Sequence, residues 1–327
     1  MTFVSLDQIR DARERIRPMA RETPLIDVSG MAGRPLWLKC ESLQPGGAFK
    51  IRGAYNMVAQ LSPAERRRGV ITYSSGNHGQ AVAIAARALD ASAVVVMPTT
   101  APRIKIEGAK QFGAEIVFAG TTSLHRRAKA EEIAVERGLT MVPPFDHEWI
   151  IAGQGTLGLE ILDQCRNVGT VLVPIGGGGL ISGVAAALKQ MRRDTTIVGV
   201  EPSGAASMKN AIDAGEVRTL EGAHSIADGL MAVRPGDLTF AHVRRFVDRL
   251  VTVDDGEIAK AVGWLFTCAK IVAEPSGAAT VAAALRLEDD YAPPVVAVIS
   301  GGNLDPADLA KYTEAGRRSS EVATDNV

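Results

Sequence analysis

The residue best placed to do chemistry is a lysine in the stretch "ESLQPGGAFKIRGAYN", residues 41–56. Lys50 follows a Pro-Gly-Gly turn and begins an apolar run that is compatible with a helix. A turn that leads into a helix start can hold a single amine near the floor of a pocket, where it could act as a nucleophile. A lone lysine is more often a surface residue, so the neighbouring motifs must show whether Lys50 has a ligand to act on.

Four consecutive glycines separate a predicted strand from a predicted helix in "VLVPIGGGGLISGVAAALKQM", residues 171–191. Such a loop lets backbone N–H groups approach a ligand, and the helix N-terminus adds partial positive charge. A plain turn needs only one or two glycines, so the loop predicts a phosphate site. A dinucleotide is one candidate ligand, because Glu201 ends the next strand where a ribose-binding acid would lie. The third glycine of that fingerprint is missing, which leaves a small phosphorylated cofactor open as well.

A second strand-to-helix junction, "YSSGNHGQAVA" at residues 73–83, gathers polar side chains where a helix has free N–H groups. Those side chains are Ser74, Ser75, Asn77 and His78. One of them would suffice as an ordinary N-cap, so the excess favours a site for a carboxylate. A third loop, "VISGGNLD" at residues 298–305, ends the last predicted strand with Ser300 and Asn303. Ligands gather at the carboxyl ends of parallel strands, so these loops predict one shared site.

Short β-branched runs alternate with Ala-rich helical patterns, which predicts parallel sheets covered by helices on both faces. The predicted strands are "GVITYSS", "ASAVVVMP", "AEIVFAG", "GTVLVPI", "TTIVGVEP" and "PPVVAVISGG". The series divides near the Pro-rich "VPPFDHEW", so we expect two α/β domains with a ligand cleft between them. We expect residues 60–147 to form a small substrate-side domain, and residues 1–59 with 148–327 to form a larger, phosphate-binding one.

An amine, a phosphate site and a carboxylate site together are what pyridoxal phosphate chemistry on an amino acid requires. The motifs "GAFKIRGAYN", "SSGNHGQA", "IAGQGTLGLEI", "GGGGLISG", "EPSGAA" and "SGGN" occur in the order found in fold-type-II pyridoxal phosphate enzymes. The chain resembles the threonine/serine dehydratase and serine racemase branch over nearly its whole length. The resemblance implies a tryptophan synthase β-like fold, with two doubly wound, mostly parallel three-layer α/β domains and the cofactor in the cleft between them.

The resemblance also implies how the cofactor is held. Lys50 would form the Schiff base with pyridoxal phosphate and later remove the α-proton of the substrate. Asn77 would hydrogen-bond the phenolic oxygen of the ring, and Ser300 would face the ring nitrogen, where a hydroxyl favours β-elimination because it does not enforce a protonated ring. The remaining implied contacts are the phosphate-binding backbone of Gly176, Gly177, Gly178 and Gly179, with Phe49 and Leu180 beside it.

On the substrate side, the resemblance places the α-carboxylate in the loop of Ser74, Ser75, Gly76, Asn77 and His78. In racemising relatives, the serine in the place of Ser75 is the acid/base on the opposite face of the ring. The implied reaction is loss of water from a β-hydroxy amino acid, L-threonine or L-serine above all, followed by release of a 2-oxo acid and ammonia. Serine racemisation is an alternative.

A second carboxylate on the substrate is a further alternative. Arg126 could grip such a group, as threo-3-hydroxyaspartate would require, and specialised dehydratases such as those of hydroxyectoine breakdown stay open. The competing interpretation of Arg126 is a solvated helix face in "SLHRRAKAEE".

Two positions depart from the pattern of the branch. Members that bind a divalent metal carry an acid six residues after the glutamate that corresponds to Glu201. This chain keeps Glu201 and the carbonyl of Ala205 but has Ser207 in place of that acid. Mg²⁺ and Ca²⁺ require several oxygen ligands, so we expect a weakened metal site at most. Ala48 replaces a serine that often precedes the lysine, while Lys50 itself is intact.

Composition narrows the remaining function classes. The formal net charge is −1 and aromatic residues make up 5% of the chain, which argues against partners such as nucleic acid or an anionic membrane. Widely spaced cysteines, no apolar run long enough for a membrane span and a charged N-terminus predict a cytoplasmic protein. By resemblance we expect a homodimer or homotetramer. The competing class is a nicotinamide-dependent dehydrogenase, which would use the glycine loop but leave Lys50 without a role.

Overall fold

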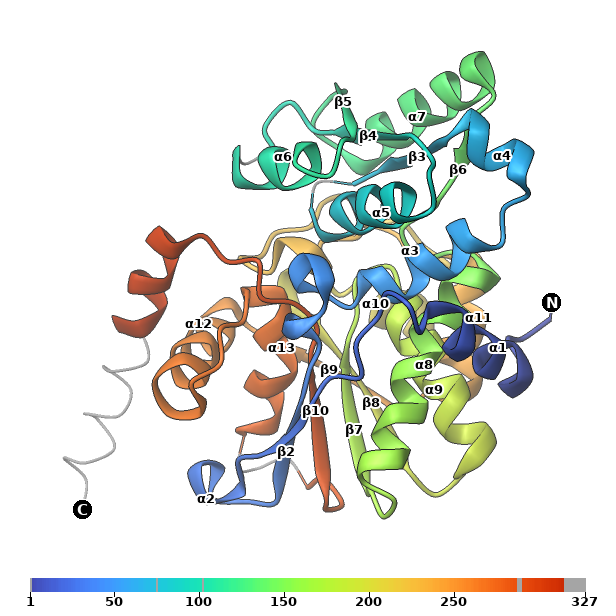
Figure 1. Ribbon diagram of the computed structural model, residues 1–327. Coiled ribbons are helices and arrows are strands. Elements are labelled where there is room, and N and C mark those ends of the chain that lie inside the picture. Colours follow the sequence, from blue (N-terminus) through green and yellow to red (C-terminus); the bar gives the residue numbers. More distant parts are fainter. Residues whose placement is uncertain (1, 75, 102, 287–289, 315–327) are drawn as a thin grey trace.

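The computed structural model describes residues 2–74, 76–101, 103–286 and 290–314. Its larger sheet has six strands in the order β1-β2-β10-β7-β8-β9 (Figure 1). Neighbouring strands run parallel, except that β1 and β2 pair antiparallel. The strands are β1 (Leu25–Asp27), β2 (Leu36–Cys40), β7 (Thr170–Pro174), β8 (Thr196–Pro202), β9 (Arg249–Val253) and β10 (Val295–Ile299). The parallel strands place their carboxyl ends at the same edge of the sheet, where loops can converge.

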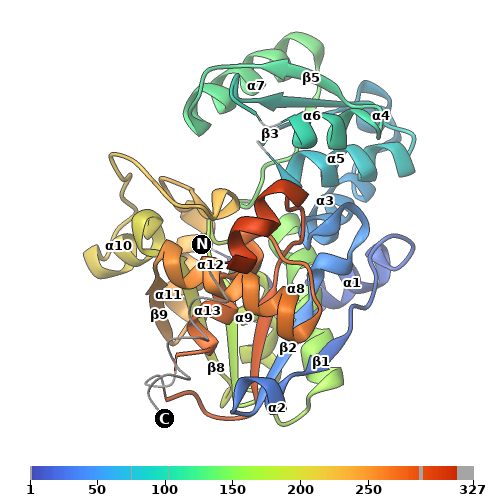
Figure 2. The same cartoon turned by 90° about the vertical axis from the view of Figure 1, so that its left-hand side faces the viewer.

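The smaller sheet has four parallel strands in the order β5-β4-β3-β6. They are β3 (Val70–Tyr73), β4 (Ala93–Met97), β5 (Glu115–Phe118) and β6 (Thr140–Met141). A parallel strand that is covered on both faces is apolar at nearly every position, as in the fully buried "AVVVM" of β4. Figures 1 and 2 show this sheet and its helices above the larger sheet, at the top of the molecule.

Helices cover both sheets. Those of the smaller sheet are α4 (Pro63–Arg68), α5 (Asn77–Ala88), α6 (Arg103–Lys110) and α7 (Ser123–Arg137). The others are α1 (Leu6–Ile16), α2 (Ser29–Ala32), α3 (Lys50–Ala59), α8 (Glu148–Gln164), α9 (Gly179–Met191), α10 (Ser207–Ala214), α11 (Asp237–Phe246), α12 (Asp255–Trp264) and α13 (Pro275–Ala284). Short helical turns are η1 (Glu41–Leu43), η2 (Pro45–Gly47), η3 (Ser203–Ala205), η4 (Asp228–Leu230) and η5 (Leu265–Ala269). None of the helices in the described residues has both the length and the apolarity to cross a bilayer.

Two apolar layers enclose the larger sheet. On one face, Leu172 and Ala297 pack in a cluster with residues of α12 and α13. On the other face, Val171, Val173 and Val298 pack with residues of α8 and α9. Successive residues of a strand point to opposite faces, so β7 and β10 contribute to both layers. The three-layer, mostly parallel α/β fold that the sequence predicts is therefore confirmed.

Candidate active site

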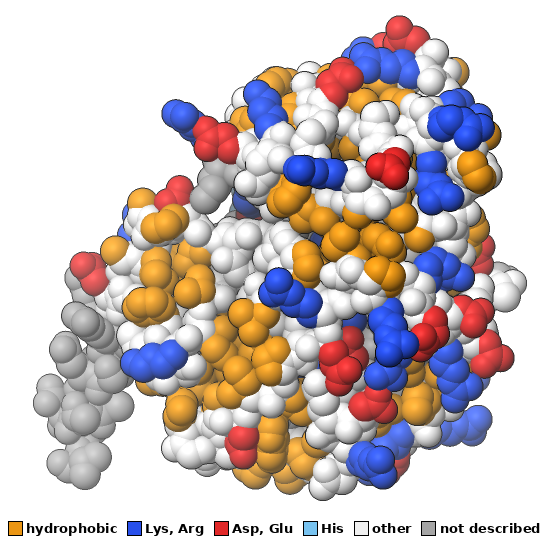
Figure 3. All heavy atoms as spheres, viewed as in Figure 1, with side chains coloured by type: hydrophobic (Ala, Val, Ile, Leu, Met, Phe, Trp, Pro, Cys, Tyr) orange, Lys and Arg blue, Asp and Glu red, His pale blue; other side chains and the backbone are white. Residues whose placement is uncertain are grey.

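A cavity of about 320 Å³ lies where the loops that follow β3, β7 and β10 meet. These loops come from both sheets and bring Asn77, Gly177 and Ser300 to the same walls as Lys50. In Figure 3, the surface is hollowed between the upper part, which holds the smaller sheet, and the lobe at the lower left. The convergence of three strand ends is what the sequence analysis predicted for a ligand site.

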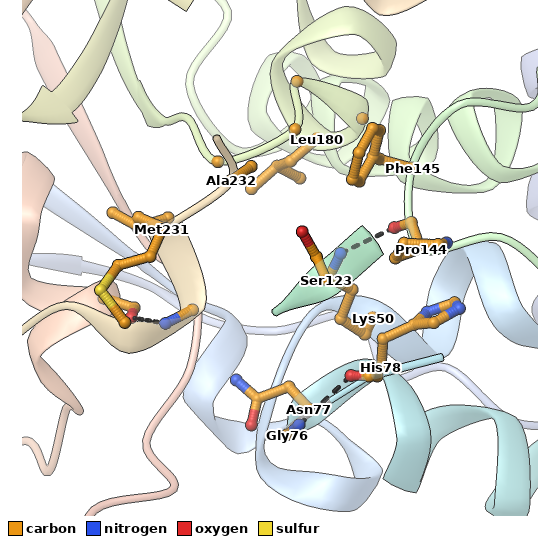
Figure 4. Close-up of a pocket in the computed structure, with 18 of the residues that line it drawn as sticks. Lys50, Gly76, Asn77, His78, Ser123, Pro144, Phe145, Leu180, Met231 and Ala232 are labelled. Atoms are coloured by element: carbon orange, nitrogen blue, oxygen red, sulfur yellow. Dashed lines mark hydrogen bonds between the residues drawn. The ribbon is translucent and has the colours of Figure 1, made fainter. Parts of the chain in front are cut away.

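Lys50 begins α3 and places its amine on the cavity (Figure 4). Its Nζ donates a hydrogen bond to the carbonyl of Pro144 at 2.8 Å and lies 5.1 Å from the centre of the Phe49 ring. Burial lowers the pKa of Lys50 to about 8, and no carboxylate of the described residues compensates for it. A lysine with this pKa has a large neutral fraction near pH 8, so it can attack a carbonyl carbon.

The glycine loop is a bare backbone turn between β7 and α9. Gly178 has a φ of 96°, in the left-handed region that glycine adopts without strain. A Cβ on Gly177 would lie 2.2 Å from Cδ1 of Phe145, so no side chain fits there. No described side chain caps the N-terminus of α9, which leaves N–H groups of its first turn available to an anion. This cradle fits a phosphate group.

The loop after β3 leads into α5 at the opposite wall. The hydroxyl of Ser74 accepts a hydrogen bond from the N–H of Gly76 at 3.2 Å, and Asn77 begins the helix. Both Ser74 and Gly76 line the cavity. Ser75 lies outside the described residues, so its roles stay predictions.

His78, in the first turn of α5, is buried as a neutral ring. Its Nε2 lies 3.1 Å from the carbonyl of Val142, and its Nδ1 has no hydrogen-bond partner in the described part of the chain. Burial, and then the nearby Lys50, lower the pKa of His78 to about 3. A neutral ring that donates from Nε2 keeps Nδ1 as an acceptor.

The side-chain amide of Asn77 is held from both ends. Its Nδ2 donates to Oε1 of Glu274, and its Oδ1 accepts from Nδ2 of Asn303 at 2.9 Å. The Nδ2 group has two hydrogens, so one N–H remains for a ligand. Glu274 therefore fixes which way the Asn77 amide faces.

Glu274 is a functional candidate that the sequence analysis missed. Burial, and secondarily the charge of Asp228, raise the pKa of Glu274 to about 7. A signal was present, because "EPSGAA" occurs twice, at residues 201–206 and 274–279. The second copy reaches the cavity through Glu274 and Ser276.

Ser300 ends β10 with its hydroxyl buried at the cavity. Its Oγ donates to the carbonyl of Ser276 at 3.3 Å, and its own carbonyl accepts from the N–H of Phe49 at 3.0 Å. The second bond ties the end of β10 to the residue before Lys50. The structure thus places every predicted cofactor residue on one cavity: Phe49, Lys50, Asn77, Gly176, Gly177, Gly178, Gly179, Leu180 and Ser300.

The predicted metal ligands Glu201 and Ala205 are both buried and do not line the cavity. The two oxygens of Glu201 accept hydrogen bonds from the N–H groups of Met208 and Lys209, each at 2.8 Å, so the carboxylate caps α10. No group of three or more His, Cys, Asp or Glu in the described residues could hold a metal ion. Capping accounts for Glu201, and the metal site stays a prediction.

Three further residues that line the cavity, Lys105, Asp146 and Asp228, carried no sequence signal that we recognised. Arg126, which was singled out, lies on α7 and does line the cavity. Lys105 of α6 forms an ion pair with Asp228 of η4 across the cavity wall. Asp146 accepts hydrogen bonds from three N–H groups at the start of α11. These contacts join segments far apart in the chain, so spacing alone does not reveal them.

Comparisons with known proteins agree with this geometry. The family described as "Pyridoxal-phosphate dependent enzyme" matches residues 16–301, and the chain belongs to that family. It is 42% identical to an L-threonine ammonia-lyase of Thermotoga maritima over 93% of this chain and 76% of the relative. It is 39% identical to a serine racemase of Oryza sativa, over 92% of this chain and 91% of that protein. The solved structure of maize serine racemase superposes with a TM-score of 0.90 at 37% identity, covering 98% of this chain and all of that one.

Pyridoxal phosphate is accordingly the cofactor of this protein, as the sequence analysis predicted. The residues present fit it, since a buried amine and a phosphate-sized glycine cradle share one cavity. The alternative of a nicotinamide-dependent dehydrogenase is thereby excluded.

Proposed function

We propose that this enzyme is an ammonia-lyase that converts a β-hydroxy amino acid, such as L-threonine or L-serine, to a 2-oxo acid and ammonia. The observation that carries the proposal is the amine of Lys50, free of any described acidic partner, on the same cavity as the glycine cradle and Asn77. The similarity to an L-threonine ammonia-lyase over most of both chains supports it.

Lys50 is the residue that would carry the cofactor covalently and then move the proton of the substrate Cα. When bound, pyridoxal phosphate supplies an electron sink next to that carbon. Released from the cofactor, the amine of Lys50 can accept the proton because burial lowers its pKa to about 8. The carbonyl of Pro144, 2.8 Å from Nζ, orients the amine on the cavity wall.

The other contacts that we propose with the cofactor come from residues on the walls of the cavity. N–H groups from Gly176 to Gly179 would bind the phosphate, helped by the N-terminus of α9. The spare N–H of Asn77 would bind the phenolic oxygen, because Glu274 and Asn303 fix the amide. The Ser300 hydroxyl would face the ring nitrogen without protonating it, which favours elimination.

The substrate carboxylate would bind in the loop that begins α5. The helix N-terminus, the N–H groups around Gly76 and the Ser74 hydroxyl supply donors there, and the neutral His78 ring adds no competing charge. Ser75 completes the predicted set.

Several broader features belong to the same proposal. The protein would act in the cytoplasm on a small amino acid, with residues 60–147 as the substrate-side domain and residues 1–59 with 148–327 as the larger one. It would be a homodimer or homotetramer. Leu43 and Val272 support self-association, because both are about half exposed, and the segments that contain them meet beside Gly302.

Serine racemisation is the second candidate, because serine racemases match this chain as fully as the ammonia-lyase does. A racemase returns D-serine from L-serine, whereas a lyase returns pyruvate and ammonia. Chiral chromatography of the unreacted serine separates the two activities.

The test is the visible absorption spectrum of the purified protein before and after addition of L-threonine or L-serine. A yellow band that is absent in Lys50→Ala, that shifts with one amino acid and that accompanies formation of its 2-oxo acid supports the proposal. A cofactor-loaded protein that forms no 2-oxo acid from either amino acid contradicts it.

A further inference from the structure

The glycine loop between β7 and α9 has no side chains of its own to fix its shape. Four glycines follow one another from Gly176 to Gly179, and Gly178 has a φ of 96°. Glycine has more backbone freedom than any other residue, so peptide planes in such a run can turn individually. A cradle that must be ordered when its ligand arrives binds that ligand more weakly than one arranged beforehand. A contact from outside the loop is the means by which this cradle could be arranged beforehand.

The first turn of α11 makes such a contact. The hydroxyl of Thr239 donates a hydrogen bond to the carbonyl of Gly177 at 2.7 Å and accepts one from the N–H of Gly236 at 3.0 Å. The same N–H of Gly236 also donates to the carbonyl of Gly177, at 3.4 Å. Thr239 is fully buried and does not line the cavity. A Cβ on Gly178 would lie 2.9 Å from the Cβ of Thr239, so the loop packs directly against this residue.

Thr239 is itself held in place from two sides. Asp146 accepts hydrogen bonds from N–H groups of the first turn of α11, including that of Thr239 at 3.1 Å. The carbonyl of Thr239 accepts a hydrogen bond from the hydroxyl of Ser182 on α9 at 3.3 Å. These contacts join parts of the protein only, so they do not depend on a bound cofactor. The hydroxyl of Thr239 therefore has a fixed position from which to hold the loop.

The hydrogen bond to the carbonyl of Gly177 also sets the direction of the N–H of Gly178, because the two groups belong to one peptide. A trans peptide, as this one is, has its C=O and its N–H on opposite sides of the chain. The N–H of Gly178 is thus turned away from Thr239. Gly178 is buried, and its N–H has no acceptor among the described residues. Buried N–H groups are seldom left unpaired, which indicates that a ligand takes this one.

We propose that Thr239 is a positioning residue for the cofactor: by holding the carbonyl of Gly177, it keeps the N–H of Gly178 aimed at the phosphate before pyridoxal phosphate binds. Thr239 acts through the loop and does not touch the cofactor. This inference rests on the proposed binding of the phosphate by the glycine loop, and it does not depend on which amino acid is the substrate. Thr239 should therefore affect recognition of the phosphate and not of the aldehyde, which is the group that Lys50 attacks.

The first test compares two ligands of the full-length apoprotein. Pyridoxal keeps the aldehyde of pyridoxal phosphate but lacks the phosphate. Thr239→Val removes the hydroxyl and leaves the shape of the side chain nearly unchanged. We expect this variant to bind pyridoxal phosphate about 3- to 10-fold more weakly than the wild type, with less than about a 2-fold change for pyridoxal. Titration of the visible absorption band that each aldehyde forms with Lys50 measures the affinities.

Thr280→Val is the matched control. Thr280 of α13 is also fully buried, its hydroxyl donates to the carbonyl of Val298 at 2.9 Å, and it does not line the cavity. Both valine variants lose one buried hydrogen bond, so their midpoints of urea unfolding should fall by similar amounts. Only Thr239→Val should lose affinity for pyridoxal phosphate. Thr239→Ser retains the hydroxyl and should bind pyridoxal phosphate within about 2-fold of the wild type.

Phosphorus NMR of the holoenzyme is the second test, because it observes the phosphate group directly. The resonance of the bound cofactor should shift or broaden in Thr239→Val and stay at its wild-type position in Thr280→Val. An unchanged resonance in Thr239→Val would mean that the phosphate keeps its surroundings without the hydroxyl, which contradicts the proposal.

The titrations also separate this inference from the proposal on which it rests. If Thr239→Val weakens both aldehydes equally, Thr239 acts through the general fold, and if it weakens neither, other contacts hold the peptide between Gly177 and Gly178. Either result overturns the role of Thr239 and leaves phosphate binding by the loop intact. If the wild-type apoprotein binds pyridoxal phosphate no more tightly than pyridoxal, the loop does not bind the phosphate, and both proposals fail.

Discussion

At the scale of single residues, the buried amine of Lys50 makes a prediction about pH. Its pKa is about 8 in the folded protein, against 10.5 for an ordinary lysine, because burial disfavours the charged form. Only the neutral amine attacks an aldehyde, so the rate of covalent cofactor uptake by the apoprotein should rise with pH and level off above about 8. Stopped-flow absorbance from pH 6 to 10 measures this, with Lys50→Ala as the blank. A midpoint near 10.5 would show that the amine is not buried as described.

The carboxyl of Glu274 predicts a second effect of pH, on stability. Its pKa is about 7 in the folded protein and 4.5 ordinarily, so between these values the folded state binds more protons than the unfolded state. Its contribution to the free energy of unfolding therefore falls as pH rises through this window, by roughly 3 kcal/mol. Glu274→Gln cannot ionise and should lose this fall. Urea unfolding of the wild-type and Glu274→Gln apoproteins at pH 4.5, 6 and 8 measures the free energy of unfolding of each. The same dependence on pH in both proteins would contradict the prediction.

Glu274 also has a positioning role that its stability effect does not test. Glu201 is a matched control, since burial raises its pKa to about 7 as well, yet it caps α10 away from the cavity. Glu274→Gln should weaken pyridoxal phosphate binding about 3- to 10-fold, because the Asn77 amide loses a charged acceptor. Glu201→Gln should leave that affinity unchanged. Fluorescence titration of the Glu274→Gln and Glu201→Gln apoproteins with pyridoxal phosphate measures the two affinities. Equal losses of affinity in the two variants would assign Glu274 a structural role only.

At the scale of elements, the glycine loop tolerates no side chain. Gly177→Ala would place a Cβ 2.2 Å from Cδ1 of Phe145, so the loop or the ring must move. We expect at least a 10-fold loss of pyridoxal phosphate affinity, since the displaced N–H groups would no longer face one point. Equilibrium dialysis measures the affinity, and Gly215→Ala at the end of α10, where a Cβ meets nothing within 4 Å, serves as a strained control outside the site. Equal affinities in the wild type and Gly177→Ala would show that the glycine loop does not bind the phosphate of the cofactor.

The elements that were predictable from sequence are those with a strong local pattern. The apolar runs "GVITYSS" and "ASAVVVMP" became β3 and β4, and the helix after the glycine loop became α9. The edge strands β1 and β9 were not foreseen, because they are only three and five residues long and each includes exposed or half-buried positions, so neither forms a continuous apolar run. The helix α8 was quoted only as a motif, since its glycines weaken the helical pattern. They serve close packing: a Cβ on Gly153 would lie 2.7 Å from the backbone of Arg52 on α3.

At the scale of the whole molecule, convergence on one cavity was predictable, whereas the pairings across it were not. Parallel strands carry ligands at their carboxyl ends, which is why the loops of Asn77, Gly176 to Gly179 and Ser300 could be joined in advance. Lys50 was added to them through the chemistry that pyridoxal phosphate requires. The Asn77–Glu274 contact spans 197 residues of chain, and the Lys105–Asp228 pair spans 123. Such contacts depend on how the two sheets face each other, and no short-range rule of sequence specifies that arrangement.

The Lys105–Asp228 ion pair gives the last prediction, because it joins α6 beside the smaller sheet to η4 beside the larger one. Asp228 is 39% exposed, so the pair should contribute less than about 1 kcal/mol to the free energy of unfolding. Its effect should instead fall on substrate binding, since it holds the two walls of the cavity together. We expect Lys105→Met to raise KM for the amino-acid substrate about 3- to 10-fold with a smaller change in kcat. A double-mutant cycle with Asp228→Asn decides the point: the second substitution should add little to the first if the pair acts as one unit. Fully additive effects on KM would mean that the two residues act separately, and that the walls are held together by other contacts.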